Sequence, residues 1–416
     1  MIELGLGEVS TPLTCRLHVS DIILFEGVAL HHRQKRIDYD ALSYCWSTGP
    51  AHDVIWCNAH ELKISSALAA ALRSFRPSLL QPPRFLWVDA ICINQEDPEE
   101  KARQVQIMLT IFQKAKSVLV WLDDAHDLDQ EAFKFLIQTE TDGQKMLLPL
   151  PERDTSAQQK MMQTVQTLCQ RPWFRRTWVR QEHFASRAVV FVCDGKVIAS
   201  DRFEMLARKM AGAADVIDVT EVESAGSKNR FEAAFDTIWP GPAADKSNIG
   251  FMFLENERGR GESKNLLTIM TGLDLFRFVR SSLFFDATNL VDKVYGLVGI
   301  LGSGTIVDDL QPQLTKNVAE LSLQISYRKS VSQVYQDFTK HIINNRGGDL
   351  SLLELHIPDP ADSDLNLPSW TINWNRPSQK ALKAVCNLLY RWNWELDTKG
   401  KVSTPRERTL KMHFNS

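Results

Sequence analysis

Short apolar runs alternate with longer amphipathic segments in the first half of this 416-residue chain, and this alternation constrains the fold more than any other feature. The runs are rich in β-branched and aromatic residues, which is typical of strands buried on both faces. They lie at Tyr39–Trp46, Phe85–Val88, Ser117–Leu122 and Ala188–Cys193. Strands separated by helices at this spacing predict a parallel α/β sheet.

Capping residues predict where two of the intervening helices begin. Ser65 or Ser66 precedes an alanine- and leucine-rich segment and suits the N-cap position. Asp97 is a good N-cap for the next helix, with Pro98 at the first helical position and Glu100 able to close a capping box. The apolar stripe of that helix, which predicts one buried face, consists of Val105, Met108, Leu109 and Phe112.

Polar and aromatic residues stand where the predicted strands end. In open parallel sheets, ligands bind beyond the carboxyl ends of the strands. The residues at those ends are Tyr44, Cys45, Trp46, Asp89, Cys92, Asp123 and Asp124. Asp89 would either supply a polar group to a site there or cap the following loop, and the cap is the more ordinary role. We therefore expect the rim of any binding site at this edge of the sheet.

Composition and charge exclude several classes of protein. The hydrophobic fraction of 44% and the charged fraction of 24% are those of a globular chain rather than a disordered one. A net charge of −3 provides no basic field for nucleic acid or an anionic membrane. No apolar run reaches the length of a membrane span, and the N-terminus lacks a signal-peptide pattern. We expect a cytoplasmic protein with no membrane span and no nucleic-acid partner.

The cysteines argue against a metal centre. There are seven, and none forms a pair with another cysteine or a histidine at zinc-binding spacing. This pattern predicts a reducing compartment and no metal site. Cys45 or Cys92 with His183 as a base would be a candidate nucleophile of a hydrolase. No thiol-enzyme signature surrounds either cysteine, so burial as a small apolar side chain is favoured.

The segment "RPWFRRTWVRQE", Arg171–Glu182, combines tryptophans, arginines and a glutamate. Its residues Pro172–Phe174 predict the packed start of a helix. If that helix continues, Arg175, Trp178 and Glu182 share one face, because they are spaced at i, i+3 and i+7. On local sequence alone, Glu182 is best interpreted as the partner of a neighbouring arginine in an ion pair worth at most about 1 kcal/mol.

Seven motifs occur in an order that resembles one protein family. They are "YDALSYCW", "LWVDAICINQEDPEEKARQVQIM", "VLVWL", "RPWFRRTWVRQE", "DATNLVDKVYGLVGIL", "VYQDFTKHII" and "LPSWTINW". Together they span roughly residues 39 to 375 and resemble the fungal heterokaryon incompatibility (HET) domain proteins. One departure is Ser47-Thr48-Gly49, where the family has glycine directly after the first tryptophan. The resemblance implies a role in non-self recognition and programmed cell death, with self-association or another incompatibility protein as partner.

HET domains in turn resemble TIR domains, which implies a fold and a chemistry. "YDALSY" is similar to the first TIR strand, and Trp178 with Glu182 is similar to the tryptophan and glutamate of a later TIR helix. The implied fold is a TIR-like (flavodoxin-like) parallel sheet flanked by helices. The expected division is an N-terminal segment at 1–36 packing on the sheet, the HET domain at 37–200, and a mainly helical region at 201–416.

In enzymatic TIR domains the corresponding glutamate cleaves NAD, which would make this chain a possible NAD glycohydrolase with NAD as substrate and no bound cofactor. Glu182 would then stabilise the oxocarbenium-like transition state at the ribose. Trp178 or Trp46 would stack on a ring of the substrate. Arg175 would hold the pyrophosphate, and Tyr44 and Asp89 would complete the substrate site. The alternative is a non-catalytic module that signals death by assembling through the same domain.

Overall fold

The computed structural model describes just under half of the chain. The described residues are 1–19 without 9, 37–122 without 47, 48 and 50, 171–199 without 185, 187 and 194, 269–271, 285–301, 305–307, 315–317, 323–345, and 365–375 without 369. Asp123 and Asp124, expected at the end of a strand, lie outside these residues. The helix expected over residues 201–217 lies outside them as well, and so does most of the helix expected over residues 265–285. Within the latter, Ile269–Thr271 is a strand, so the expectation of a helix there is wrong.

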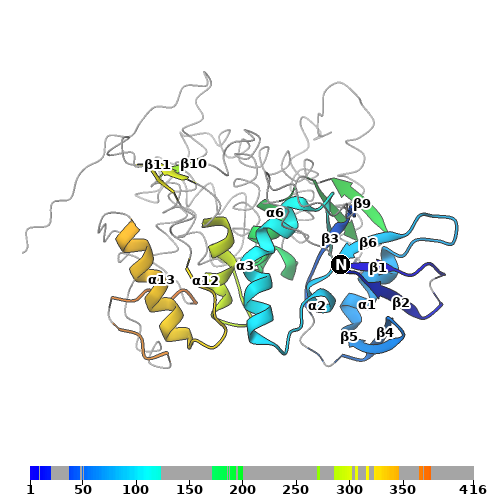
Figure 1. Cartoon of the computed structure of the whole chain (residues 1–416), viewed down its shortest axis with the longest axis horizontal. Helices are drawn as coiled ribbons and strands as arrows, with labels where there is room; N and C mark the ends of the chain where they lie inside the picture. Colours follow the sequence, from blue (N-terminus) through cyan, green and yellow to red (C-terminus); the bar gives the residue numbers. More distant parts are fainter. Residues whose placement is uncertain are drawn as a thin grey trace, which may run out of the picture.

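A nine-stranded sheet with helices on both faces forms the main body of the described structure (Figure 1). Its strands, in chain order, are β1 (Ile2–Leu4), β2 (Leu13–Leu17), β3 (Asp40–Tyr44), β4 (Asp53–Cys57), β5 (His60–Ile64), β6 (Arg84–Trp87), β7 (Val118–Trp121), β8 (Val189–Cys193) and β9 (Lys196–Ala199). Their order across the sheet is β5-β4-β2-β1-β6-β3-β7-β8-β9. The four apolar runs form β3, β6, β7 and β8, which lie side by side and parallel, so the predicted α/β class is confirmed.

The sheet as a whole is mixed, so the prediction of a parallel sheet holds only for its centre. Strand β1 runs antiparallel to both β2 and β6. The pairs β4–β5 and β8–β9 are also antiparallel, because short turns join them. Asn58 and Ala59 have positive φ angles of 48° and 66° in the first turn, and Gly195 has a φ of 69° in the second. Positive φ angles of this kind are the usual requirement of tight hairpin turns.

Alternate residues of the central strands face two different helical layers. Leu42 and Tyr44 of β3 pack with α1 (Ser66–Ser74) on one face. Ala41 of β3 packs on the other face with α3 (Pro98–Lys114) and, further along, α12 (Asp292–Leu301). Ser43 is on the same face as Ala41, since side chains alternate along a strand. This face carries the site described below.

The predicted caps of α1 and α3 are confirmed, with one difference. The Ser65 side chain accepts a hydrogen bond from the backbone N–H of Leu68 at 3.2 Å. The Asp97 side chain accepts from the backbone N–H groups at the start of α3. Glu100 does not close a capping box with Asp97; its carboxylate accepts from the N–H of Asn94 at 3.0 Å. The Asp97 N–H donates to the Asn94 carbonyl instead, which ties down the loop between α2 (Asp89–Cys92) and α3.

Two helices and a small sheet are described beyond residue 201. They are α12 (Asp292–Leu301), α13 (Val331–Asn345), and β10 (Ile269–Thr271), β11 (Thr305–Val307) and β12 (Thr315–Asn317). Figure 1 shows α12 lying between α3 and α13, and α12 also contacts α6 (Val179–Phe184). Most of 201–416 lies outside the described residues, so a mainly helical C-terminal region stays a prediction.

Two glycines allow α12 to approach α6 closely. A Cβ atom on Gly296 would lie 2.5 Å from Cγ2 of Thr177, and one on Gly299 would lie 2.8 Å from Oε1 of Gln181. Thr177 cannot turn away easily, because its hydroxyl donates to the Asp286 carbonyl at 3.1 Å. The glycines of the "DKVYGLVG" motif therefore allow α12 to pack closely against α6 and against Thr177, which precedes α6.

We expect Gly296→Ala to lower the free energy of unfolding by about 1–2 kcal/mol. The overpacking against Thr177 costs about 1–3 kcal/mol, and the better helix propensity of alanine returns somewhat less than about 1 kcal/mol. Urea denaturation of both proteins measures the difference. Gly49→Ala is the control, since a Cβ there meets nothing within 4 Å. Equal stability of the Gly296 variant and the parent protein would contradict the close helix contact.

Candidate functional site

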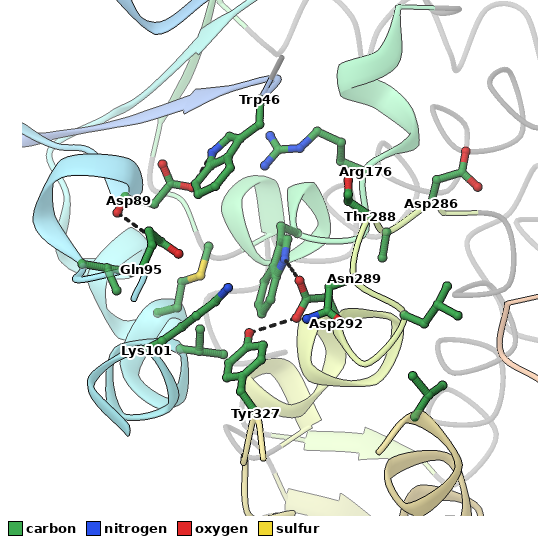
Figure 2. A pocket seen from close by; sticks show the side chains of 17 residues that line it. Trp46, Asp89, Gln95, Lys101, Arg176, Asp286, Thr288, Asn289, Asp292 and Tyr327 are labelled. Carbon is green, nitrogen blue, oxygen red and sulfur yellow. Dashed lines mark hydrogen bonds between the residues drawn. The ribbon is translucent and has the colours of Figure 1, made fainter. Parts of the chain in front are cut away.

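A cavity of about 640 Å³ opens beyond the carboxyl ends of β3 and β6, the edge at which the sequence predicts a site (Figure 2). One wall comes from the strand ends and from α3, and it includes Trp46, Asp89 and Lys101. The opposite wall comes from residues 286–292 and from Tyr327. The cavity is therefore built by segments that are far apart in the sequence.

The first wall combines an aromatic ring with a half-buried carboxylate. The Trp46 side chain is 47% exposed, and its indole N–H donates to Oδ2 of Asp89 at 3.0 Å. Oδ1 of Asp89 accepts from the N–H of Ala90 at 2.7 Å, so Asp89 caps its own loop and also lines the cavity. Burial raises the pKa of Asp89, although the nearby Arg176 opposes the shift. The half-exposed indole leaves an aromatic face available to a planar ligand.

The second wall is organised around Asp292. Its Oδ2 accepts from the indole N–H of Trp178 at 3.3 Å, and its Oδ1 accepts from the hydroxyl of Tyr327 at 2.9 Å (Figure 2). Nζ of Lys101 lies 4.6 Å from the centre of the Tyr327 ring, a cation–π contact. Burial raises the pKa of Asp292 despite these donors. This carboxylate therefore joins Trp178, in the segment Arg171–Glu182, to the second wall.

Glu182 is almost fully buried and is held by a directed chain of hydrogen bonds. The indole N–H of Trp173 donates to Oγ of Ser43 at 2.6 Å, and Ser43 donates to Oε2 of Glu182. Because Ser43 accepts from Trp173, its own hydrogen points toward Glu182. Burial raises the pKa of Glu182, with Arg176 and Ser43 opposing the shift. The remaining oxygen, Oε1, lies 3.8 Å from Nη2 of Arg176.

Arg176 occupies the break between two short helices. The segment Arg171–Glu182 is not one helix, because η1 (Pro172–Arg175) ends where Arg176 becomes extended and forms a parallel bridge with Asp286. The second helix, α6, begins only at Val179. Nη1 of Arg176 donates to the Tyr44 carbonyl, and the guanidinium lines the cavity. The prediction that Arg175 shares a helical face with Trp178 and Glu182 is therefore wrong.

This geometry can be compared with known proteins. The family model described as "Heterokaryon incompatibility protein (HET)" matches residues 39–182, a span that runs from the residue before β3 to the glutamate held by Ser43. The chain carries a HET domain. It is also 25% identical over 395 residues to "Heterokaryon incompatibility protein 6, OR allele" of Neurospora crassa. That similarity covers 81% of this chain and 53% of the relative, so the chain spans about half the length of the curated protein that it matches. No solved structure matches the chain.

The HET domain brings together three of the six predicted site residues. Trp46, Asp89 and Trp178 all line the cavity. Tyr44 directs its side chain to the opposite face of the sheet, among the residues packed on α1, and only its carbonyl contacts Arg176. Arg175 and Glu182 are not on the lining, and Arg176 separates Glu182 from the cavity.

Five residues of the site were not predicted as site residues from the sequence, and four of them line the cavity. Arg176 was passed over in favour of its neighbour, because a continuous helix would have turned it away. Ser43 lies within an apolar strand and had no signal of its own. Lys101 and Asp292 lie within two of the motifs that resemble the HET family, but nothing in their local pattern marks them as site residues, and Tyr327 lies outside these motifs.

The core aromatics and the candidate thiol nucleophile have clear positions. Trp173 and Phe174 are buried in the main core, which confirms the predicted packed start of the segment. Burial raises the pKa of the Cys92 thiol, which is the opposite of what a thiolate nucleophile needs.

Within the described ranges, no three His, Cys, Asp or Glu side chains are placed to hold a metal ion. No helix among the described residues is long and apolar enough to cross a membrane.

We expect Glu182 to lower the stability of the folded protein as the pH rises. Its pKa is higher in the folded state than in the unfolded chain, where it is about 4.3. The folded state then binds the proton more tightly, so the free energy of unfolding falls as the pH rises from about 4 through the raised pKa. In the Glu182→Gln variant the side chain cannot ionise, so this contribution to the pH dependence of the free energy of unfolding should disappear. Urea denaturation at several pH values should show the stability of the variant, relative to the parent, increasing with pH. A constant or decreasing difference would contradict the assignment.

Proposed function

We propose that this chain acts in fungal heterokaryon incompatibility, in which contact with non-self leads to programmed cell death. The HET domain over residues 39–182 supports this role. The similarity to the Neurospora crassa incompatibility protein over most of the chain supports it further. Self-association or contact with another incompatibility protein would couple recognition to the response.

We further propose that the HET domain cleaves NAD at the bond between nicotinamide and ribose. The observation that supports this most is the cavity beside Trp178 and Glu182, at the carboxyl edge of parallel strands. It offers the half-exposed Trp46 for stacking, Arg176 and Lys101 for phosphate groups, and carboxylates for ribose hydroxyls. These are the groups that a dinucleotide requires.

The chemistry asks little of the protein, because nicotinamide leaves as a neutral molecule. Water adds at C1′ of the ribose as the glycosidic bond breaks, giving ADP-ribose, nicotinamide and a proton. Glu182 would stabilise the positive charge that develops on the ribose in the transition state. Oε2 of Glu182 is held by Ser43, so Oε1 is the oxygen available for this role.

A second candidate function is assembly or nucleotide binding without cleavage. One observation favours it: Glu182 is 2% exposed and is not on the cavity lining, and its carboxylate lies against Ser43 and Arg176. In this function Glu182 balances the charge of Arg176. The HET domain would then signal through its surface or its ligand rather than through a product.

Incubation of the purified full chain with NAD, with and without a crowding agent, separates the two functions. Nicotinamide release is followed by chromatography, and the oligomeric state is followed by light scattering. Release under any of these conditions supports the NAD glycohydrolase. Absence of release under every condition that drives self-association overturns it and leaves the non-catalytic function.

A further inference from the structure

We propose that Arg176 is both the phosphate ligand of the cavity and a movable cover over Glu182. A phosphate group in the cavity would draw the guanidinium away from Glu182 and so expose Oε1 to the ligand. This inference rests on the proposed function for the class of ligand, a nucleotide that carries phosphate. It does not depend on whether that nucleotide is cleaved.

The contacts of Arg176 leave donors for a ligand. Nη1 donates to the Tyr44 carbonyl, which anchors one edge of the guanidinium. Nη2 lies 3.8 Å from Oε1 of Glu182, which is beyond hydrogen-bond distance, so this contact is a loose ion pair. Figure 2 shows the guanidinium directed toward Trp46 and Asp89 at the cavity wall. An arginine placed in this way can present parallel N–H donors to a phosphate.

The contacts of Glu182 prevent its carboxylate from following Arg176. Ser43 donates to Oε2, and Trp173 fixes the direction of the Ser43 hydroxyl. A phosphate in the cavity and Oε1 of Glu182 therefore compete for the same nitrogen, Nη2. Once Arg176 turns to the phosphate, Oε1 loses its cover. This exchange explains how a glutamate behind the lining could reach a ribose only when a nucleotide is bound.

Competition of this kind has a measurable consequence for affinity. Loss of the Glu182 charge should free Arg176 and strengthen the binding of phosphate. A glutamate that merely supported Arg176 would have the opposite effect when replaced. ADP and adenosine are suitable probes, because they differ in phosphate and contain no nicotinamide to be released.

Calorimetric titration of the full chain with ADP and adenosine tests the exchange. In the parent protein we expect ADP to bind at least about tenfold more tightly than adenosine, which corresponds to about 1.4 kcal/mol. Arg176→Gln should remove this preference. Glu182→Gln should tighten ADP about two- to fivefold and leave adenosine unchanged, a gain of the size expected when one loose ion pair is released. Thermal unfolding of each variant checks that it folds. If Arg176→Gln does not fold, Arg176→Lys takes its place, and we expect it to weaken the binding of ADP several-fold.

The other outcomes decide against the inference or against the proposed activity. The phosphate assignment is wrong if Arg176→Gln keeps the preference, or if Arg175→Gln, the neighbouring control, loses it. The exchange is wrong if Glu182→Gln weakens ADP or leaves its affinity unchanged. Failure of both probes to bind rejects the nucleotide site itself. An arginine-dependent preference for ADP in a protein that does not cleave NAD would reject only the proposed glycohydrolase.

Discussion

Glu182→Gln should reduce the rate of nicotinamide release from NAD by about 10²–10³-fold, the usual effect of removing one group that stabilises charge in a transition state. Glutamine has the size of glutamate, and its carbonyl can still accept from Ser43. It cannot supply the negative charge that the ribose requires. The fold should remain intact, because the variant keeps the buried hydrogen bond and loses a carboxylate that burial disfavours.

The control for this prediction is a glutamate of the same HET domain outside the cavity. Glu99 pairs with Arg328 at 2.6 Å, and its side chain is 61% exposed. Glu99→Gln should therefore keep the rate of nicotinamide release within about twofold, as a loss at a surface ion pair would. A Glu182→Gln protein that folds and releases nicotinamide at the parental rate would show that Glu182 is not catalytic. It would favour its role as the partner of Arg176.

Asp292→Ala should lower the free energy of unfolding by about 2–4 kcal/mol. Two hydrogen bonds to a buried carboxylate are lost, and the indole N–H of Trp178 and the hydroxyl of Tyr327 lose their acceptor. Relief of the buried charge, whose pKa burial raises, offsets part of this cost. The lost hydrogen bonds join the HET domain to the second wall of the cavity, so we expect the affinity for ADP to decrease as well.

Urea denaturation of Asp292→Ala and Asp337→Ala measures this effect against a matched surface residue. Asp337 pairs with Lys329 at 2.9 Å with both side chains more than a third exposed, so its loss should cost no more than about 1 kcal/mol. Asp292→Asn should fall between the two, since the amide keeps one acceptor. Equal stability of the two alanine variants would contradict the central position of Asp292 in the second wall.

The parts of the fold that the sequence predicted are those with a strong local signal. Strands β3, β6, β7 and β8 are short apolar runs buried on both faces. The start of α3 can be predicted from Asp97 at the N-cap and Pro98 at the first helical position. Strand β5 is exposed along most of its length and has no apolar pattern. Strand β1 has three residues, and only its pairing with β2 and β6 identifies it as a strand. Such short or exposed strands carry little local signal, because contacts with neighbouring strands stabilise them.

The candidate site divides in the same way. Trp46 and Asp89 could be predicted because they directly follow buried strands. Arg176 could not, because its extended conformation depends on a bridge to Asp286, a residue far away in the sequence. The ion pair expected for Glu182 is present, but with Arg176 and beneath the surface of the cavity. The second wall could not be predicted, because its position depends on the packing of α12 against α6. That packing depends on Gly296 and Gly299, which have no distinctive pattern in the sequence.

The most direct test of the account is a crystal structure of the Glu182→Gln protein with NAD. This variant should bind NAD and cleave it about 10²–10³-fold more slowly than the parent protein, so the intact substrate can be trapped. We expect NAD in the cavity between the HET domain and residues 286–292, with its pyrophosphate on Arg176 and the nicotinamide ribose facing residue 182. NAD bound elsewhere, or an empty cavity at a saturating concentration of NAD, would contradict the account.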